Sequence, residues 1–174
     1  ADHITSRVPM IVRMPDGRNS GRVDGGLHYQ CDVGATVLEL AGGSAPDHWD
    51  AVSFADAFTA GRDGGRDYVV FSQNAWACQR AVRWDDWVFI RTYHTGLKDL
   101  PERMLFNIAE DPHEVSNLAE SRPEMADHGQ ALIEQWTADQ MATSDSDADP
   151  MWTVMREGGP FHGREVGEKY INHL

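Results

Sequence analysis

The sequence predicts an α+β fold, in which a small antiparallel sheet packs against a helix towards the C-terminus, and three observations support this. Residues 67–108 contain four short stretches rich in branched and aromatic residues, which is the pattern of strands. A helical pattern with apolar residues on one side follows over about residues 122–141. Before the strands, one short apolar stretch precedes two helical segments. A run of strands followed by a packed helix is typical of α+β proteins.

The strands are predicted from their composition and from the turns between them. Asp85 and Asp86 separate the second stretch from the third, and two residues are enough for a tight hairpin turn. An antiparallel meander is therefore expected. Its four stretches are "DYVVFSQ", "QRAVRW", "WVFIRTY" and "RMLFNI".

The connection after the last strand contains the signals of a turn and of a helix start. Asp111-Pro112 is expected to form a rigid turn, and Asn117-Leu118-Ala119 to hold the returning loop by an amide hydrogen bond and a buried leucine. Ser121 and Glu124 have the spacing of a capping box. The helix that follows is predicted to bury Met125, Leu132, Ile133 and Trp136.

The first 66 residues are predicted to contain a strand and two helices. Residues 8–14 form an apolar run closed by a Pro-Asp-Gly turn signal, which favours a buried strand. Asp32 is expected to cap a helix, and Ser53 with Asp56 to form a capping box for a second helix. The predicted apolar side of the first helix is Val33, Val37, Leu38 and Leu40.

The charge balance is strongly acidic. The net charge is -13, with 18 aspartates, 10 glutamates and two lysines, Lys98 and Lys169. Such a surface is expected of a halophilic protein, because molar salt screens the repulsion among carboxylates; an ordinary acidic protein is the alternative. No basic stripe is present to bind nucleic acid, and no apolar run approaches the roughly 20 residues of a membrane span.

The two cysteines, Cys31 and Cys78, do not suggest a disulfide framework or a thiolate metal site, since they lie far apart in unrelated contexts. Two small buried thiols in a reducing compartment are expected. No leader sequence is visible, so a cytoplasmic location is predicted.

Four segments, in the same order along the chain, resemble the C-terminal part of sulfatases, the sulfate-ester hydrolases of the alkaline-phosphatase superfamily. "RVPMIVRMPDGRNSGRV" resembles the R-V-P-hydrophobic-I pattern with its proline–glycine turn. "MLFNIAEDPHEVSNLAESRPE" resembles the element L-[YF]-[DN]-hydrophobic-x-x-D-P-x-E-x-x-N-L-A. Between them lie "DVGATVLELAGGSAPDHWDAVSFADAFTAG" and "RAVRWDDWVFIR". The resemblance covers residues 7 to about 136 and rests on several separate elements.

This resemblance implies three parts. Residues 1–66 are expected to be the end of the sulfatase core, so that the leading strand and helices belong to a larger alkaline-phosphatase-like α/β fold. Residues 67–142 form the antiparallel sheet and its helix, and residues 143–174 an acidic linker and tail. Asp145, Asp147 and Asp149 have the spacing of a calcium loop, but Pro150 and Arg156 stand where that loop needs glycine and glutamate. A disordered linker is expected there.

Sulfatases use a formylglycine made from Cys or Ser in a C/S-x-P-x-R element, and a divalent cation, usually calcium, held mainly by aspartates. Neither Cys31 nor Cys78 is followed by the required Pro and Arg, and Asp85-Asp86 lies in the predicted hairpin. We therefore expect a C-terminal part of a sulfatase, inactive by itself, whose partner is the N-terminal catalytic portion. Calcium is expected for the complete enzyme, with none bound by this chain alone, and the implied substrate is a sulfated small molecule or sugar.

Two histidines are candidate site residues. The family has a Lys or His that contacts sulfate shortly before the R-V-P strand, which makes His3 a candidate catalytic residue. Its four-residue spacing to Arg7 is shorter than the family's roughly nine, and a frayed terminal histidine is the alternative. His94, in "TYHTG", is a candidate substrate-binding residue, with a solvated loop histidine as the alternative.

Two other functions remain open. The chain could be a stand-alone, non-catalytic module that binds a partner or a sulfated sugar, or part of a related phosphoester or phosphonate hydrolase. Residues 8–12 distinguish the module from the sulfatase part, since a stable monomer that buries them would favour the module. A nucleophile motif upstream of the chain would distinguish the two hydrolases.

The charge balance gives a testable prediction about salt. The melting temperature should rise steeply as potassium chloride is raised to molar concentration, because screening then acts over only about 3 Å. Thermal unfolding followed by circular dichroism at low and molar salt measures this. An unchanged melting temperature would contradict the halophilic interpretation.

Overall fold

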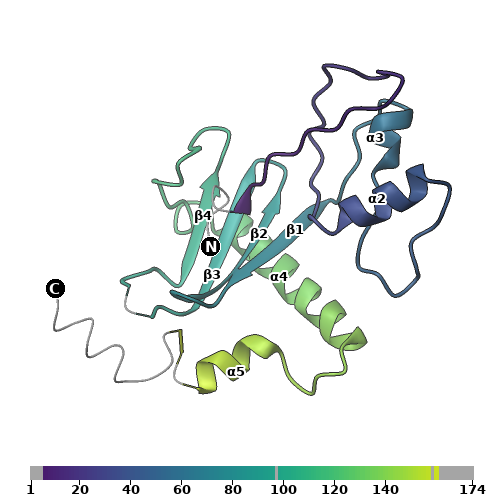
Figure 1. The fold of residues 1–174 in the computed structure, drawn as a ribbon. Helices are drawn as coiled ribbons and strands as arrows, with labels where there is room; N and C mark the ends of the chain where they lie inside the picture. Colours follow the sequence, from purple (N-terminus) through teal and green to yellow (C-terminus); the bar gives the residue numbers. More distant parts are fainter. Residues whose placement is uncertain (1–5, 97, 158, 161–174) are drawn as a thin grey trace, which may run out of the picture. The chain divides into compact units, whose positions relative to one another are not determined.

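The computed structural model describes residues 6–96, 98–157 and 159–160, and the chain divides into two compact units. One unit, called here the N-terminal unit, comprises Val8–Val69. The other, called the sheet unit, comprises the described residues on either side of it. In Figure 1 the helices α2 (Asp32–Leu40) and α3 (Ala55–Thr59) belong to the N-terminal unit, and α4 (Pro123–Thr143) and α5 (Pro150–Arg156) to the sheet unit.

The sheet has four strands in the order β1-β2-β3-β4, which confirms the predicted meander. They are β1 (Tyr68–Gln73), β2 (Cys78–Trp84), β3 (Trp87–His94) and β4 (Arg103–Asn107). Both β2–β3 and β3–β4 pair antiparallel. Trp84 and Trp87 are paired, so Asp85 and Asp86 alone make the turn, with Asp85 at a φ of 42° in the left-handed region that aspartate tolerates.

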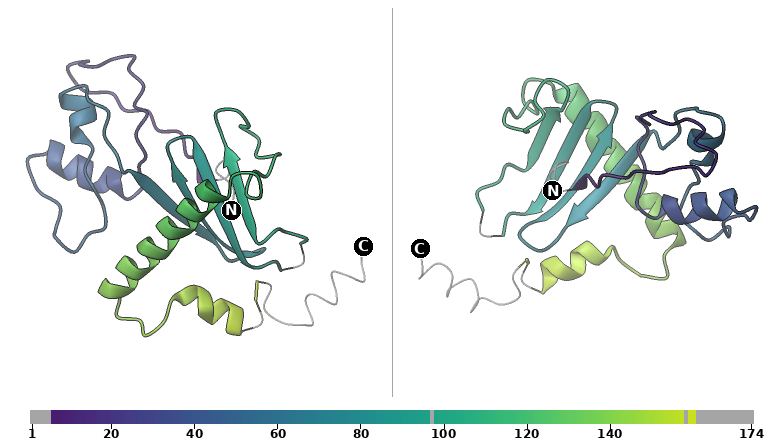
Figure 2. Two further views of the ribbon diagram at one scale, coloured as in Figure 1. Left: turned by 180° about the vertical axis from the view of Figure 1, so that it is seen from behind. Right: turned by 45° about the horizontal axis from the view of Figure 1, so that its top comes forward.

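The two faces of the sheet have different neighbours. Helix α4 crosses one face (Figure 2), where the Trp84 ring lies edge-on to His128 at 5.3 Å. Because successive side chains along a strand alternate between the two faces of the sheet, the neighbours of Trp84 in its strand point to the face away from α4. There a buried cluster forms from different strands, and partly buried apolar side chains pack around it. The cluster is Ala81, Val88, Ile90 and Phe106, surrounded by Phe71, Met104 and Ile108.

Helix α4 begins at Pro123, whose fixed φ suits the first helical position. The predicted capping box is wrong: the N-cap is Arg122, without a side-chain cap, and the Ser121 hydroxyl donates to the carbonyl of Leu118 at 3.2 Å. The proline, which has no N–H to be capped, accounts for the start instead. Of the predicted apolar face only Ile133 is fully buried, together with the small residues Ala126 and Gly129.

Gly129 is the point of closest approach between α4 and the sheet. A Cβ built on it would lie 2.7 Å from Cγ of Phe89 on β3 and even closer to its Cβ. Phe89 is fully buried. A glycine is therefore needed here for its lack of a side chain, and its poor helix propensity is tolerated.

The loop before α4 is held much as predicted. The amide of Asn117 accepts from the backbone N–H of Leu105 and of Ala119, both at 3.0 Å, and donates to the carbonyl of Arg103 at 3.1 Å. Leu118 is half-buried, and it is Ala119 that is buried. The Asn117 side chain thus replaces a missing strand partner along β4.

The turn at Asp111 is also built by a side chain. Its carboxylate accepts from the backbone N–H of Ser116 and of Val115, each at 2.8 Å. These bonds stabilise the charged form and lower the pKa of Asp111. Glu114 within this loop has a φ of 53°.

In the N-terminal unit, α2 buries a different side from the predicted one. Ala35 and Thr36 are buried, whereas Val37 is 59% exposed and Leu40 37% exposed. Asp32 is the first helical residue rather than the cap, because its carboxylate bonds outside the helix. The hydroxyl of Thr36 accepts the N–H of Phe54 at 3.0 Å, which joins α2 to the start of α3.

Two further predictions for this unit are wrong. Ser53 accepts the N–H of Ala55 at 3.2 Å, but Phe54 is the N-cap of α3 and Asp56 pairs with Arg62, so no capping box forms. Residues 8–14 form no strand, and Ile11 is 97% exposed. Within the described residues no neighbouring strand pairs with this segment, so its backbone has no sheet to join.

Gly129→Ala should destabilise the sheet unit by about 1–3 kcal/mol, because the new methyl group overlaps Phe89 and the helix has to move outwards. Gly34→Ala in α2 is the matched control, since its Cβ meets only Trp49, at 3.9 Å. The control should be neutral or gain about 0.5–1 kcal/mol from helix propensity. Urea unfolding of both variants measures the difference, and equal stability of the two would contradict the close contact.

Candidate functional site

The two predicted site residues have different outcomes. His3 lies outside the described residues. His94 ends β3, and its Nδ1 accepts the backbone N–H of Gly96 at 2.9 Å. The ring also lies against Gly159, where a Cβ would come within 2.8 Å of Nε2. His94 is half-buried at the end of the strand.

A nearly buried ion pair lies between the sheet and the C-terminal helices. Arg80 on β2 donates to Asp149 twice, from Nη1 to Oδ2 at 2.8 Å and from Nη2 to Oδ1 at 3.0 Å. The two side chains are only 8% and 12% exposed. Arg80 also donates to Thr137 on α4 at 2.8 Å and lies over the Trp136 ring at 5.3 Å. One arginine therefore contacts both helices from the sheet.

Asp149 has a second function, as the N-cap of α5. Its Oδ1 accepts the backbone N–H of Met151 at 3.0 Å. Burial acts to raise the pKa of Asp149, but the hydrogen bonds from Arg80 and Met151 outweigh it and hold the pKa below its ordinary value. Asp149 is thus fixed in a segment that the sequence predicts to be disordered. The overlooked signal is Asp149-Pro150, a capping residue followed by proline at the first helical position.

A cavity of about 300 Å³ lies beside this ion pair, between the sheet, α4 and α5. Tyr93 and Trp152 form part of its wall, with ring centroids 6.5 Å apart in an edge-to-face arrangement. Burial raises the pKa of Tyr93, so its hydroxyl stays protonated at neutral pH. The described residues that line it are Arg80, Tyr93, Ile133, Glu134, Thr137, Ala138, Met141, Asp149, Met151, Trp152 and Met155. His94 is not among them.

Three arginines occupy paired positions on neighbouring strands on the α4 side of the sheet. Arg80 is opposite Arg91 across β2 and β3, and Arg91 is opposite Arg103 across β3 and β4. Like charges placed opposite each other destabilise a sheet unless they are neutralised. Each arginine has an acidic partner from a different part of the sheet unit: Asp149, Glu102 and Asp127.

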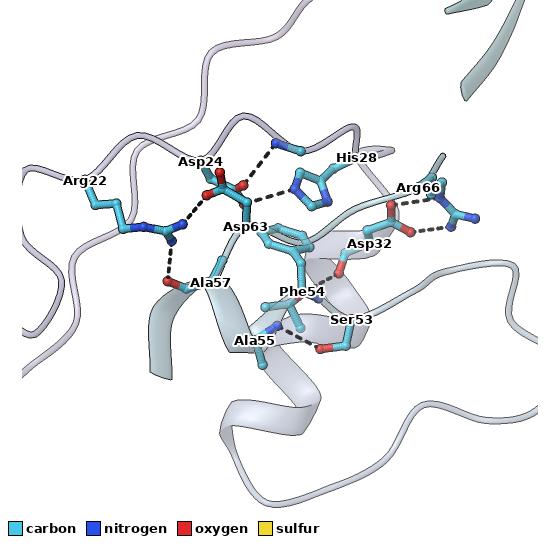
Figure 3. A network of polar contacts seen from close by, with 12 residues as sticks. Arg22, Asp24, His28, Asp32, Ser53, Phe54, Ala55, Ala57, Asp63 and Arg66 are labelled. Atoms are coloured by element: carbon cyan, nitrogen blue, oxygen red, sulfur yellow. Dashed lines mark hydrogen bonds and ion pairs between the residues drawn. The ribbon is translucent and has the colours of Figure 1, made fainter. Parts of the chain in front are cut away.

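The N-terminal unit contains a second buried ion pair, shown in Figure 3. The Asp32 carboxylate, 1% exposed, accepts from Arg66 Nη2 at 2.6 Å and Nε at 3.2 Å. It also accepts the backbone N–H of Tyr29 and of Val52, each at 2.7 Å. Burial acts to raise the pKa of Asp32, but these bonds, with that of Arg66 the strongest, lower it overall. Asp32 therefore ties together three segments of the unit.

A histidine–aspartate contact lies in the same network (Figure 3). His28 Nε2 is 3.1 Å from Asp24 Oδ2, and its ring stacks on Phe54 at 4.1 Å. Arg22 pairs with Asp63 and donates to the carbonyl of Ala57 at 3.1 Å. In the part of the chain that the structure describes, His28 has no nucleophilic side chain among these contacts. The network joins the loop before α2 to α3, and it is structural.

The chemistry of sulfate-ester hydrolysis has no assembled site among the described residues. They contain no group of three or more His, Cys, Asp or Glu side chains that could hold a metal ion. Cys31 is exposed rather than buried as predicted, whereas Cys78 is buried and desolvation raises its pKa. Asp85 and Asp86 are exposed in the hairpin. Nor is any described helix long and apolar enough to cross a membrane.

Asp149→Asn should lower the free energy of unfolding by about 3 kcal/mol, because it leaves the Arg80 guanidinium buried without a counter-charge. Asp127→Asn is the control, since Asp127 pairs with Arg103 at 2.5 Å but is 70% exposed, and its loss should cost less than about 1 kcal/mol. Urea unfolding at neutral pH compares the variants. Similar losses of unfolding free energy in the two variants would contradict the argument that burial makes the Arg80–Asp149 pair more important than the exposed pair.

The same pair predicts a pH dependence. Asp149 has a lowered pKa in the folded chain, so its stabilisation is present above the ordinary value of 3.8 and is lost as the pH falls through the folded-state pKa. The difference in unfolding free energy between wild type and Asp149→Asn should therefore be constant above about pH 5 and shrink below pH 4. Urea titrations at a series of pH values measure it. A difference that does not change with pH would contradict ionisation of Asp149.

Comparison with known proteins agrees with this architecture. The family model described as "N-sulphoglucosamine sulphohydrolase, C-terminal" matches residues 3–142, which is more than half of the chain. No curated protein sequence matches. Among solved structures, a Bacteroides thetaiotaomicron protein described in work on its metabolism of multiple glycosaminoglycans has a TM-score of 0.53 at 21% identity, over 66% of this chain. A 2-O GAG sulfatase has a TM-score of 0.51, also at 21% identity over 66% of this chain.

The chain spans only 26% of the length of each of these two structures. At this level of identity the likeness concerns the fold alone. The match of the family model extends from before the R-V-P segment to the end of α4. The chain belongs to the N-sulphoglucosamine sulphohydrolase C-terminal family.

Proposed function

We propose that this chain completes a sulfatase that hydrolyses sulfate esters, and that the nucleophile and metal are supplied by an N-terminal catalytic portion outside the 174 residues. The observation that carries this proposal is an apolar segment at residues 8–12 that stays exposed in the part of the chain that the structure describes. Val8, Met10, Ile11 and Val12 are 66%, 47%, 97% and 45% exposed. Family membership and the missing C/S-x-P-x-R element also support the proposal that the catalytic groups come from the N-terminal portion.

The energetics of this segment favour a larger fold over a stand-alone module. Fully burying a Val, Ile or Met side chain stabilises by about 1.5–3 kcal/mol relative to exposure. Apolar residues at successive positions, rather than alternating ones, are typical of strands covered on both faces of a parallel sheet. A self-sufficient module would bury this segment, and here it is exposed.

The two histidines have subsidiary parts in the proposal. His3 would contact the sulfate group, and His94 would contact the substrate from the end of β3. The N–H of Gly96 donates to Nδ1 of His94, so Nε2 carries the proton in the neutral ring and can act as a donor. The substrate is proposed to be a sulfated sugar or a sulfated small molecule.

The residues described here do not fit the calcium site expected for a complete sulfatase. They include no metal-binding group of carboxylates, and the adjacent pair Asp85-Asp86 lies exposed in a hairpin turn. No step of the proposal uses a metal bound by this chain. We further propose a cytoplasmic, high-salt setting, supported by two free thiols and the net charge of -13.

The chain alone should not hydrolyse a chromogenic aryl sulfate, because its sequence has no C/S-x-P-x-R element to supply the nucleophile, and catalytic groups act as a unit. Joined to the segment encoded immediately upstream, with its nucleophile matured to formylglycine, it should turn over the same substrate. An upstream segment with a different nucleophile would favour the related phosphoester or phosphonate hydrolase. Turnover by the purified 174-residue chain that survives a chelator would contradict the proposal.

Ile11→Asp separates docking from folding. Since Ile11 is 97% exposed, the variant should unfold within about 0.5 kcal/mol of wild type. It should nevertheless fail to bind the separately expressed upstream portion, as measured by size-exclusion chromatography of the mixture. Val115→Asp, at a site 79% exposed in the loop before α4, is the control and should leave binding intact. Equal binding by both variants would exclude residues 8–12 as the docking segment.

A further inference from the structure

The cavity beside Arg80 has the size and wall of a small-molecule site. Its volume of about 300 Å³ is at the lower end of the range of ligand pockets. Ile133 and Met151, both buried, lie along it, and Met141 and Met155 complete an apolar lining. Methionines adapt their shape to an apolar guest at little energetic cost.

An aromatic pair forms another side of the cavity. Tyr93 and Trp152 meet edge-to-face, with an interplanar angle of 68°. Trp152 projects from α5 and remains 50% exposed. The faces of such rings attract cations through their quadrupole.

The charges of the lining favour one kind of guest. Arg80 and Asp149 neutralise each other through two hydrogen bonds, and Thr137 takes a further donor of Arg80. Glu134 accepts a hydrogen bond from Gln130 at 2.7 Å, and among the described residues it has no cationic partner. Among the described lining residues, Glu134 is therefore the acid whose charge is not compensated; it is exposed at the rim of the cavity, and its charge acts on the Tyr93 hydroxyl.

We propose that this cavity binds a small organic cation with an apolar body, such as a quaternary ammonium that carries a ring. The methionines and Ile133 would receive the apolar part, and Tyr93, Trp152 and Glu134 would surround the charge. An anionic guest, including a sulfated sugar, is disfavoured because Arg80, the one arginine among the described lining residues, is already paired twice with Asp149. The net charge of -13 also attracts cations to the chain. This site is separate from the proposed sulfatase function and does not depend on it.

The charge selectivity is tested with three probes that share one ring. The binding of benzyltrimethylammonium, benzyl alcohol and benzenesulfonate to the 174-residue chain is measured by isothermal titration calorimetry at one fixed ionic strength. The cation should bind about tenfold more tightly than the neutral ring, and the anion should bind most weakly. Absence of saturable binding by the cation, or equal affinity for the three probes, would overturn the proposal.

Two matched variants test the location. Glu134→Gln keeps the shape of the side chain and removes the charge, and should weaken cation binding about fivefold to tenfold. Asp139→Asn is the control, since Asp139 on the same helix accepts from Gln135 at 2.8 Å in the same four-residue spacing but does not line the cavity. It should leave the affinity unchanged. Equal weakening in both variants would show a general charge effect and no site.

The aromatic wall has its own readout. Trp152→Leu should lower the affinity for the cation more than the affinity for benzyl alcohol, because leucine replaces the apolar area but not the ring quadrupole. Thermal unfolding by circular dichroism confirms that each variant is folded before titration. If Trp152→Leu weakened both probes alike, the preference for a cation over a neutral ring would not come from this wall, and the proposal would fail.

Discussion

The sheet unit depends on the neutralisation of one buried guanidinium. Arg80 stands in a central strand, under two helices, and is buried. An unpaired charge at such a depth would cost several kcal/mol, so the surrounding chain has to supply acceptors. Thr137 comes from α4, and Asp149 comes from a position 69 residues further along. The return of the chain to the sheet after α4 is therefore explained by an electrostatic requirement as much as by apolar packing.

The N-terminal unit also contains a buried charge that a distant residue neutralises, but there the buried group is an acid. There the fully buried group is the carboxylate of Asp32, and Arg66 reaches it from 34 residues away. In both cases the arginine donates two hydrogen bonds to one carboxylate, which a lysine ammonium does not reproduce. In a chain with only two lysines, both of these buried ion pairs use arginine.

The parts of the fold that could be predicted from the sequence are those set by local periodicity. The four strands, the two-residue turn at Asp85-Asp86 and helix α4 follow from patterns within about 20 residues, and the hydrogen bonds of Asn117 from its place in a loop. The capping boxes at Ser121 and Ser53 failed because a proline and a tertiary contact determine those helix starts. The strand expected at residues 8–14 failed because strand formation needs a neighbouring strand, and no sequence pattern can supply one.

The candidate sites were less predictable for a related reason. His94 could be singled out from its position after a strand, but its partners Gly96 and Gly159 are not evident from the motif. The pairing of Arg80 with Asp149 joins positions that no local rule connects. The cavity is the space left where two helices and a sheet fail to fill one another, and it is therefore a property of the packing alone.

The glycine in α4 has a consequence for that cavity. Contact at Gly129 holds one part of the helix against Phe89, while the cavity-lining positions of α4 begin one turn later, at Ile133, and extend to Met141. The depth of this contact, together with the contacts of His128 with Trp84 and of Thr137 with Arg80, sets how far the later turns stand from the sheet. The volume and entrance of the cavity are thus determined at a distance, by a residue that touches none of its contents. Natural variation at position 129 would change which molecules fit there without altering any lining side chain.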